Sequence, residues 1–252
     1  DVYKRQLHLE GTAKKDSAMT NDTNDTNEPL TLSSAAVVES SLLAFGTGMT
    51  AQNRQDVKNS YLFASLVANK RHDQLTLGEA WFGYFLEAMN DLGWAVAQRT
   101  HENASDTGQS LTLSNVVVKA VEVAASNLIG GASVVQSLGL FAEKSIQSLS
   151  KNEQALTLFK RSLHQRSNVM VGVASCIETK DGEVVMALGA IQRRIRKEDL
   201  GTPLFDWNSN TSSTFRSTAA LSFNTQIYAK ARGLVEQRLG ERAVSRIMDY
   251  EI

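Results

Sequence analysis

Hydrophobic residues recur every three or four positions through the first two thirds of the chain, which predicts helices there. Gly46-Thr-Gly48 and Gly130-Gly131 interrupt this spacing, and we expect helices to break at these glycines. The helices expected from the spacing cover residues 37–45, 54–70, 76–92 and 152–163, with two more inside 116–149.

The helix expected over residues 76–92 has the clearest start signal. Thr76 offers an N-cap, and Glu79 stands three residues later, as in a capping box. A broad aromatic face follows, which we expect to pack into the core. Residues 93–101 then alternate between apolar and polar side chains, which predicts a first strand.

The hydrophobic period changes to two near residue 169. Residues 169–177 alternate, and Asp181-Gly182 forms a turn into residues 183–194, so we expect a β-hairpin. Both faces of this hairpin are rather apolar, which indicates central strands that are covered on each side.

Two further strands are expected at residues 204–207 and 214–223, and Asn224 caps a final long helix that ends at Leu239. A short helix follows Gly240. The expected inner side of the long helix consists of Ile227, Tyr228, Ala231, Leu234, Val235 and Leu239. The order of elements predicts an α+β fold: an antiparallel sheet of about five strands, with a meander in the C-terminal half, covered by helices.

Residues 30–252 are expected to form a single α+β domain behind a disordered tail. Residues 1–29 are polar and low in complexity, which predicts disorder. Residues 1–6 resemble the in-frame translation of a sequencing adaptor, and Met19 is then the candidate start of the natural chain. No basic and apolar leader follows Met19, so we expect a protein that is cytoplasmic or is exported without a signal peptide.

Charge and cysteine content narrow the classes of function. The chain has 26 Lys and Arg against 27 Asp and Glu, a formal charge of −1. Nothing in this balance favours a nucleic-acid partner, which calls for a basic excess. Cys176 is the single cysteine, which excludes an intrachain disulfide and fits a reducing compartment.

No catalytic or metal-binding motif is visible in the sequence. The histidines are scattered, and neither a phosphate-binding glycine loop nor a nucleophile elbow occurs, so we expect no metal site. An enzyme would need a dispersed site. A cleft that gathers His72, Asp73, His101 or Glu178 would be its mark.

One basic run stands out in the chain. It consists of Arg193, Arg194, Arg196 and Lys197. Such a run protects the edge of a sheet from pairing with other chains, and contact with a phosphate or a lipid headgroup is the alternative interpretation.

Residues 116–149 and Cys176 are the features with a lipid interpretation. The two apolar segments approach membrane-spanning length, but Lys119, Glu122 and Glu143 interrupt them, so we expect buried helices that cover the sheet. Cys176 has small neighbours and no nearby cation, as is typical of an inert buried thiol. A cavity beside its strand would instead let the thiol carry a lipid chain.

From residue 54 onward the chain resembles the Erwinia virulence factor Evf family. The strings that carry the resemblance are Trp-Phe-Gly-Tyr-Phe-Leu, Leu-Gly-Trp-Ala-Val, Leu-Thr-Leu-Phe, Met-Ala-Leu-Gly-Ala and Ile-Tyr-Ala-Lys-Ala-Arg-Gly-Leu-Val-Glu-Gln-Arg-Leu-Gly. The resemblance implies an α/β fold and a palmitoylated central cysteine. Cys176 is the only residue that can correspond to the acylated position.

The leading hypothesis is therefore a non-enzymatic virulence or host-persistence factor that binds a fatty-acyl chain or a membrane surface. Covalent palmitate on Cys176 would be its only non-protein group, and the basic run would contact headgroups. An enzyme with a dispersed site and a soluble interaction protein without a ligand are the alternatives.

Overall fold

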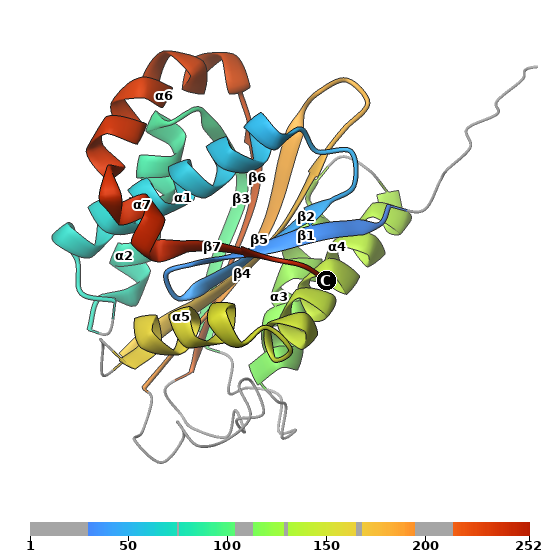
Figure 1. Ribbon diagram of the computed structural model, residues 1–252. Coiled ribbons are helices and arrows are strands. Elements are labelled where there is room, and N and C mark those ends of the chain that lie inside the picture. The colour runs from blue at the N-terminus through green and yellow to red at the C-terminus, as the bar shows by residue number, and fades with distance from the viewer. Residues whose placement is uncertain (1–29, 75, 104–112, 129–130, 165–167, 195–213) are drawn as a thin grey trace, which may run out of the picture.

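A seven-stranded β-sheet runs through the middle of the molecule, between two layers of helices (Figure 1). This computed structural model describes residues 30–74, 76–103, 113–128, 131–164, 168–194 and 214–252. The disorder expected for residues 1–29 and the strand expected at 204–207 lie outside these ranges.

The strands of the sheet follow the order β3-β6-β5-β4-β2-β1-β7. They are β1 (Leu32–Val38), β2 (Ser41–Gly46), β3 (Trp94–Asn103), β4 (Asn168–Glu178), β5 (Val184–Arg194), β6 (Phe215–Phe223) and β7 (Ile247–Tyr250). Neighbouring strands are antiparallel except β2 and β4, which run parallel with Ser41 opposite Gly172. The α+β class fits, whereas the expectation of about five strands was too low for the described part of the chain.

Two hydrophobic cores flank the sheet. One face packs against α1 (Ala51–Arg71), α2 (Gly78–Asp91) and α6 (Thr225–Leu239). The other packs against α3 (Leu113–Ala125), α4 (Gly131–Leu149) and α5 (Glu153–His164), and the short α7 (Glu241–Arg246) leads into β7. Residues 116–149 thus form covering helices, as predicted: α3 ends at Ala125 and α4 begins at Gly131, beside the expected break at Gly130-Gly131.

The predicted helix over residues 37–45 was wrong, because this segment forms the hairpin of β1 and β2. Val38 lies opposite Ser41 and Val37 opposite Leu42, while Glu39 turns the chain with a φ of 53°. Both faces of these strands are covered, so their side chains are apolar without alternation. A short apolar run of this kind cannot be distinguished from a buried helix by its periodicity.

The predicted hairpin of β4 and β5 is confirmed. Glu178 lies opposite Val184, and Gly182 in the turn has a φ of 79°, a conformation that glycine adopts without strain. Strands β4, β5 and β6 are consecutive antiparallel neighbours, so the expected meander is present in the described residues.

Only one of the two expected helix caps is confirmed. The Asn224 side chain accepts a hydrogen bond from the backbone N–H of Ile227 at 3.0 Å and begins α6. Thr76 does not cap α2, because its backbone N–H donates to the Asp73 carboxylate at 3.0 Å and the helix begins two residues later. The carboxylate stabilises a local turn that competes with the capping box.

The inner side of α6 is narrower than its spacing predicted. Tyr228, Val235 and Leu239 are buried, but Ile227 and Leu234 are 49% and 57% exposed. The helix therefore contacts the core through one narrow stripe, and the prediction was wrong for these two side chains.

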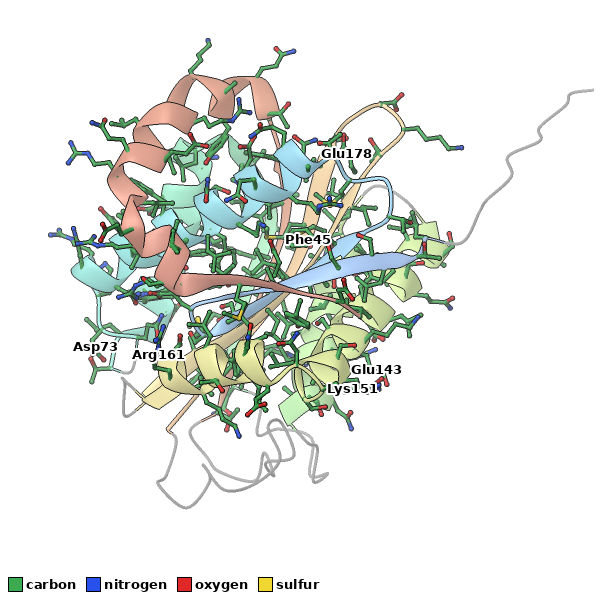
Figure 2. The ribbon with its side chains drawn as sticks, viewed as in Figure 1. Phe45, Asp73, Glu143, Lys151, Arg161 and Glu178 are labelled. Carbon is green, nitrogen blue, oxygen red and sulfur yellow. The ribbon has the colours of Figure 1, made fainter. Side chains whose placement is uncertain are left out.

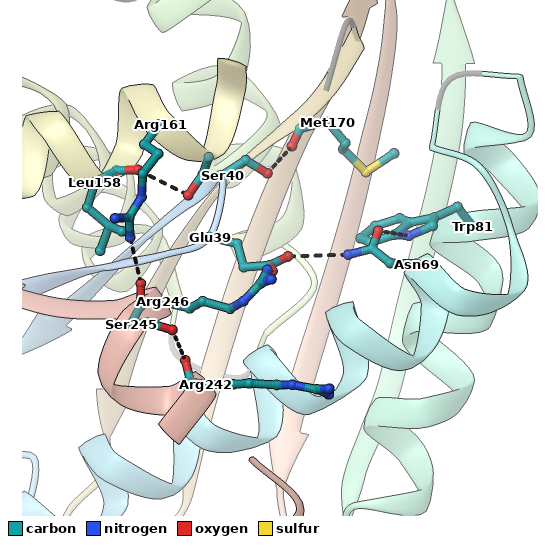
Figure 3. A network of polar contacts seen from close by, with 11 residues as sticks. Glu39, Ser40, Asn69, Trp81, Leu158, Arg161, Met170, Arg242, Ser245 and Arg246 are labelled. Carbon is teal, nitrogen blue, oxygen red and sulfur yellow. Dashed lines mark hydrogen bonds and ion pairs between the residues drawn. The ribbon is translucent and has the colours of Figure 1, made fainter. Parts of the chain in front are cut away.

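Three ion pairs fasten the C-terminal elements to the rest of the fold, and we call them the C-terminal clamp. They are Asp56–Arg232, Lys58–Asp249 and Glu39–Arg246. Figure 3 shows Arg246 beside Glu39, whose carboxylate also accepts a hydrogen bond from Asn69. The clamp ties α6, α7 and β7 to α1 and to the turn after β1.

Candidate functional site

Cys176 lies in β4 on the face of the sheet covered by α1, α2 and α6. Its side chain is fully buried, with Phe45 of β2 and Met186 of β5 opposite it. Burial raises the pKa of the thiol well above its usual range, which keeps it protonated. A protonated thiol is a poor nucleophile, so attachment of a lipid would require access before α1 packs against the sheet. Acylation at Cys176 stays a prediction.

A small polar cavity lies under α1 and α2 on the same face. Ser41, Tyr61 and Gln74 are among the residues that line it, and its volume is about 10 Å³. The buried Oε1 of Gln74 has no hydrogen-bond partner within the described residues. Since a water molecule needs roughly 10–15 Å³, the cavity suits one water and not an acyl chain.

An apolar groove runs between α5 and the segment formed by α7 and β7, and we call it the α5 groove. Its volume is about 450 Å³. Leu158, Val244 and Met248 give it an apolar lining, and Val244 is 85% exposed although it is apolar. The residues that line the groove are Glu153, Gln154, Thr157, Leu158, Arg161, Val244, Ser245 and Met248.

Arg161 lines the α5 groove near the C-terminal end of α5, where Figure 2 labels it. One guanidinium nitrogen donates to the backbone carbonyl of Ser245 at 3.0 Å, which bridges α5 to α7 (Figure 3). The guanidinium keeps further N–H donors for a ligand. Glu153 lies eight positions earlier on the same helix, about 12 Å along its axis, so the two charges lie at opposite ends of the α5 side of the groove.

A second and more polar cleft lies between α2 and β3, and we call it the α2–β3 cleft. Its volume is about 710 Å³. It gathers His72 from the end of α1 and His101 from β3, two of the four residues that the sequence named for a dispersed enzyme site. The residues that line it are Arg71, His72, Glu79, Ala80, Phe82, Gly83, Tyr84, Glu87, Arg99, Thr100 and His101.

The other two named residues lie elsewhere. Figure 2 shows Asp73 and Glu178 near opposite ends of the molecule. The carboxylate of Glu178 accepts a hydrogen bond from the backbone N–H of Thr50 at 2.8 Å, and that of Asp73 holds the turn before α2. Both carboxylates have structural roles.

Neighbouring side chains hold the two histidine rings of the α2–β3 cleft. Nδ1 of His101 lies 2.8 Å from the hydroxyl of Ser217, and its ring stacks on Phe215 with centroids 5.3 Å apart. The His72 and Tyr84 rings pack in a T-shaped arrangement, with their centroids 5.6 Å apart. Ser217 is buried, so His101 has a fixed partner behind it and only Nε2 remains to contact a ligand.

The basic run that the sequence named as a headgroup site begins at the end of β5. Arg193 and Arg194 end β5, but their side chains lie outside the described part, as do Arg196 and Lys197 entirely. Headgroup contact by these four residues stays a prediction.

Two general features of the described residues bear on the site. None of the helices in the described ranges is both long and apolar enough to cross a membrane. Within the same ranges, no three His, Cys, Asp or Glu side chains are grouped so that they could hold a metal ion.

The molecule is thus a mixed α/β protein with a central sheet, helices on both faces and two open clefts. No protein-family model matches the chain, and no curated protein is detectably similar to it. A solved structure described as a delta-endotoxin is similar at 12% identity and a TM-score of 0.38, over 90% of this chain and 94% of that one. The Evf virulence factor is a weak structural neighbour, with 10% identity and a TM-score of 0.30 over 88% of this chain and 87% of that one. At TM-scores this low, neither structure guides the assignment of an activity.

Proposed function

We propose that this protein is a non-enzymatic, virulence-related factor that binds a fatty-acyl chain. The observation that carries the proposal is the α5 groove, whose exposed lining is mainly apolar and includes the cation Arg161. Its volume of about 450 Å³ falls within the range of roughly 300–1,000 Å³ that is usual for sites of small organic ligands.

The chemistry of the groove matches a fatty acid better than a purely apolar ligand. Leu158, Val244 and Met248 offer apolar surface to the acyl chain, and Arg161 on the same groove suits a carboxylate. Glu153 at the other end would repel a carboxylate, so the ligand has one orientation, with its head at Arg161.

Calorimetric titration with octanoate, decanoate, dodecanoate and palmitate tests this function. Each added methylene contributes about 0.8 kcal/mol while it is buried, so we expect the affinity to rise about fourfold per methylene and to level off once the chain fills the groove. An affinity that does not change with chain length would contradict the proposal.

The variant Val244→Asp tests whether the fatty acid binds in the α5 groove. This substitution places a charge on the apolar lining at a residue that is 85% exposed, so it should spare the fold and lower fatty-acid affinity at least tenfold. Leu234→Asp is the matched control, because Leu234 is 57% exposed on α6 and does not line the groove. Equal losses in the two variants would exclude the α5 groove.

Arg161→Gln tests the orientation of the ligand. We expect it to lower the affinity for decanoate by up to about fivefold, since an exposed ion pair contributes up to about 1 kcal/mol. Binding of decanol, which has no carboxylate, should not change. A parallel loss for decanol would show that Arg161 acts by packing alone.

Covalent attachment at Cys176 is a separate form of lipid binding, because this residue lies on the opposite face of the sheet from α5. Intact-mass measurement of the protein from its native host tests it. Attachment predicts the added mass of one palmitoyl group, which hydroxylamine removes and which is absent from Cys176→Ser. An unmodified mass would assign Cys176 to core packing.

A further inference from the structure

We propose that the α2–β3 cleft binds a phosphate ester whose organic part carries hydroxyl groups, such as a sugar phosphate or a nucleotide. The inference concerns a site distinct from the α5 groove and does not depend on fatty-acid binding. It rests on charged side chains of both signs that face one cleft without pairing with one another.

The cations of the cleft come from two elements. Arg71 ends α1 and Arg99 belongs to β3, and neither guanidinium has an ion-pair partner within the described ranges. Arg99 reaches α2 beside Gly83, since its Nη1 lies at the ordinary contact distance of 3.6 Å from the position that a Cβ would occupy there. A guanidinium presents a planar fork of donors that matches a phosphate, and two of them suit a dianion.

His101 adds a ring nitrogen that is already oriented, and Nε2 is the donor when Nδ1 accepts from the Ser217 hydroxyl. Its Nδ1 is engaged by Ser217 at 2.8 Å and its ring is stacked on Phe215, so little side-chain freedom is lost when a ligand binds Nε2. His72, held against Tyr84, lines the same cleft.

The carboxylates of the cleft exclude a bare anion. Glu79 and Glu87 stand four residues on either side of Gly83 on the same face of α2, and both are exposed and line the cleft. Within the described residues they pair with neither arginine. They would repel inorganic phosphate, but they accept hydrogen bonds from hydroxyl groups, as acidic residues do when they bind a ribose.

A hydroxylated phosphate ester therefore satisfies both sets of charges at once. The phosphate pairs with the arginines and His101, and the hydroxyl groups donate to the carboxylates of α2. The cleft volume of about 710 Å³ is large enough for a sugar phosphate or a mononucleotide.

Calorimetry with four probes tests this inference: inorganic phosphate, ribose, ribose 5-phosphate and AMP. We expect ribose 5-phosphate and AMP to bind at least tenfold more tightly than inorganic phosphate, and ribose alone not to bind. Tighter binding of AMP than of ribose 5-phosphate would identify a nucleotide site, and equal binding a sugar-phosphate site. Inorganic phosphate that binds as tightly as the esters, or no saturable binding of either ester, would overturn the proposal.

Two substitutions separate this site from general charge attraction. Arg99→Gln should lower the affinity for ribose 5-phosphate at least tenfold, whereas Arg238→Gln, an exposed arginine of α6, should leave it unchanged. Glu79→Gln should raise the affinity for inorganic phosphate and lower that for ribose 5-phosphate. Equal losses in the two arginine variants, or the same sign for both ligands in Glu79→Gln, would contradict the assignment.

Discussion

At the scale of single residues, two glycines differ in whether the fold needs the absence of a side chain. Gly189 in β5 faces α3, and a Cβ there would lie 2.8 Å from the Val117 carbonyl and 2.9 Å from the Val121 nitrogen. Gly233 lies on the exposed side of α6, in the middle of the helix, and a Cβ there would meet no atom within 4 Å. Gly189 thus lets a helix approach the sheet, whereas Gly233 only weakens its own helix.

Alanine at these two positions should shift stability in opposite directions. Gly189→Ala forces α3 away from the sheet and should cost about 1–3 kcal/mol, as overpacked cores do. Gly233→Ala should stabilise the protein by about 0.5–1 kcal/mol, because it removes freedom from the unfolded chain. Thermal unfolding should show a Tm change of about 2–4 °C per kcal/mol for a chain of this size. Shifts of the same sign would contradict the packing described for α3.

At the scale of elements, the C-terminal clamp contains a fully buried carboxylate. Asp56 is fully buried in α1, and Arg232 of α6 reaches both of its oxygens at 2.9 and 2.6 Å. Gln52 donates to the same carboxylate at 2.9 Å. A buried carboxylate held by a bidentate arginine is strongly destabilising once that arginine is removed.

Arg232→Met should therefore destabilise the protein by roughly 3 kcal/mol in urea unfolding, because it leaves the buried Asp56 carboxylate without its bidentate partner. The double variant Asp56→Leu/Arg232→Met should recover most of this loss. Arg216→Met is the control: it breaks a more exposed pair with Glu102, which should matter by less than about 1 kcal/mol. A loss in Arg232→Met no larger than in the control would show that the Asp56–Arg232 pair does not stabilise the fold.

The elements also show what the sequence could and could not predict. The hairpin of β4 and β5 was predictable because alternation and Asp181-Gly182 agree, and α6 because Asn224 caps it. The hairpin of β1 and β2 was missed because both of its faces are covered and its turn uses Glu39, which is not a typical turn residue.

The candidate sites divide in the same way. His72 and His101 were named from the sequence, and the fold brings them to one cleft. The α5 groove was not predictable, because its two walls lie far apart in sequence: Arg161 and Ser245, which bridge them, are 84 residues apart. No periodicity within either segment indicates that the other lies beside it.

At the scale of the whole molecule, the buried thiol and phenol groups limit the stability of the fold at high pH. Tyr61, Cys176, Tyr228 and Tyr250 are buried, and burial raises the pKa of each above its usual range. Each is therefore neutral in the folded protein at a pH where the unfolded chain has already lost the proton.

Stability should accordingly be full below about pH 8.5, where the unfolded thiol is still protonated, and should fall as the pH rises. The thiol titrates first in the unfolded chain, and the tyrosines follow above about pH 10. Each group then lowers the free energy of unfolding by about 1.4 kcal/mol per pH unit. Urea unfolding across this range measures the slope, and Cys176→Ala should remove its first part. A stability that stays constant from neutral pH to pH 11 would contradict the burial of these groups.

The parallel pairing of β2 with β4 has a consequence for how the chain reaches this structure. Within the described residues it is the one ladder that joins β3-β6-β5-β4 to β2-β1-β7, and it pairs Ser41 with Gly172, more than a hundred residues later. The β1–β2 and β4–β5 hairpins can form locally, whereas this seam, like the β3–β6 and β1–β7 ladders, joins segments far apart in the sequence. Because a non-local seam costs chain entropy to close, it should form more slowly than the hairpins. Until it closes, the apolar edges of β2 and β4 are both unpaired, and aggregation during refolding or expression should begin there.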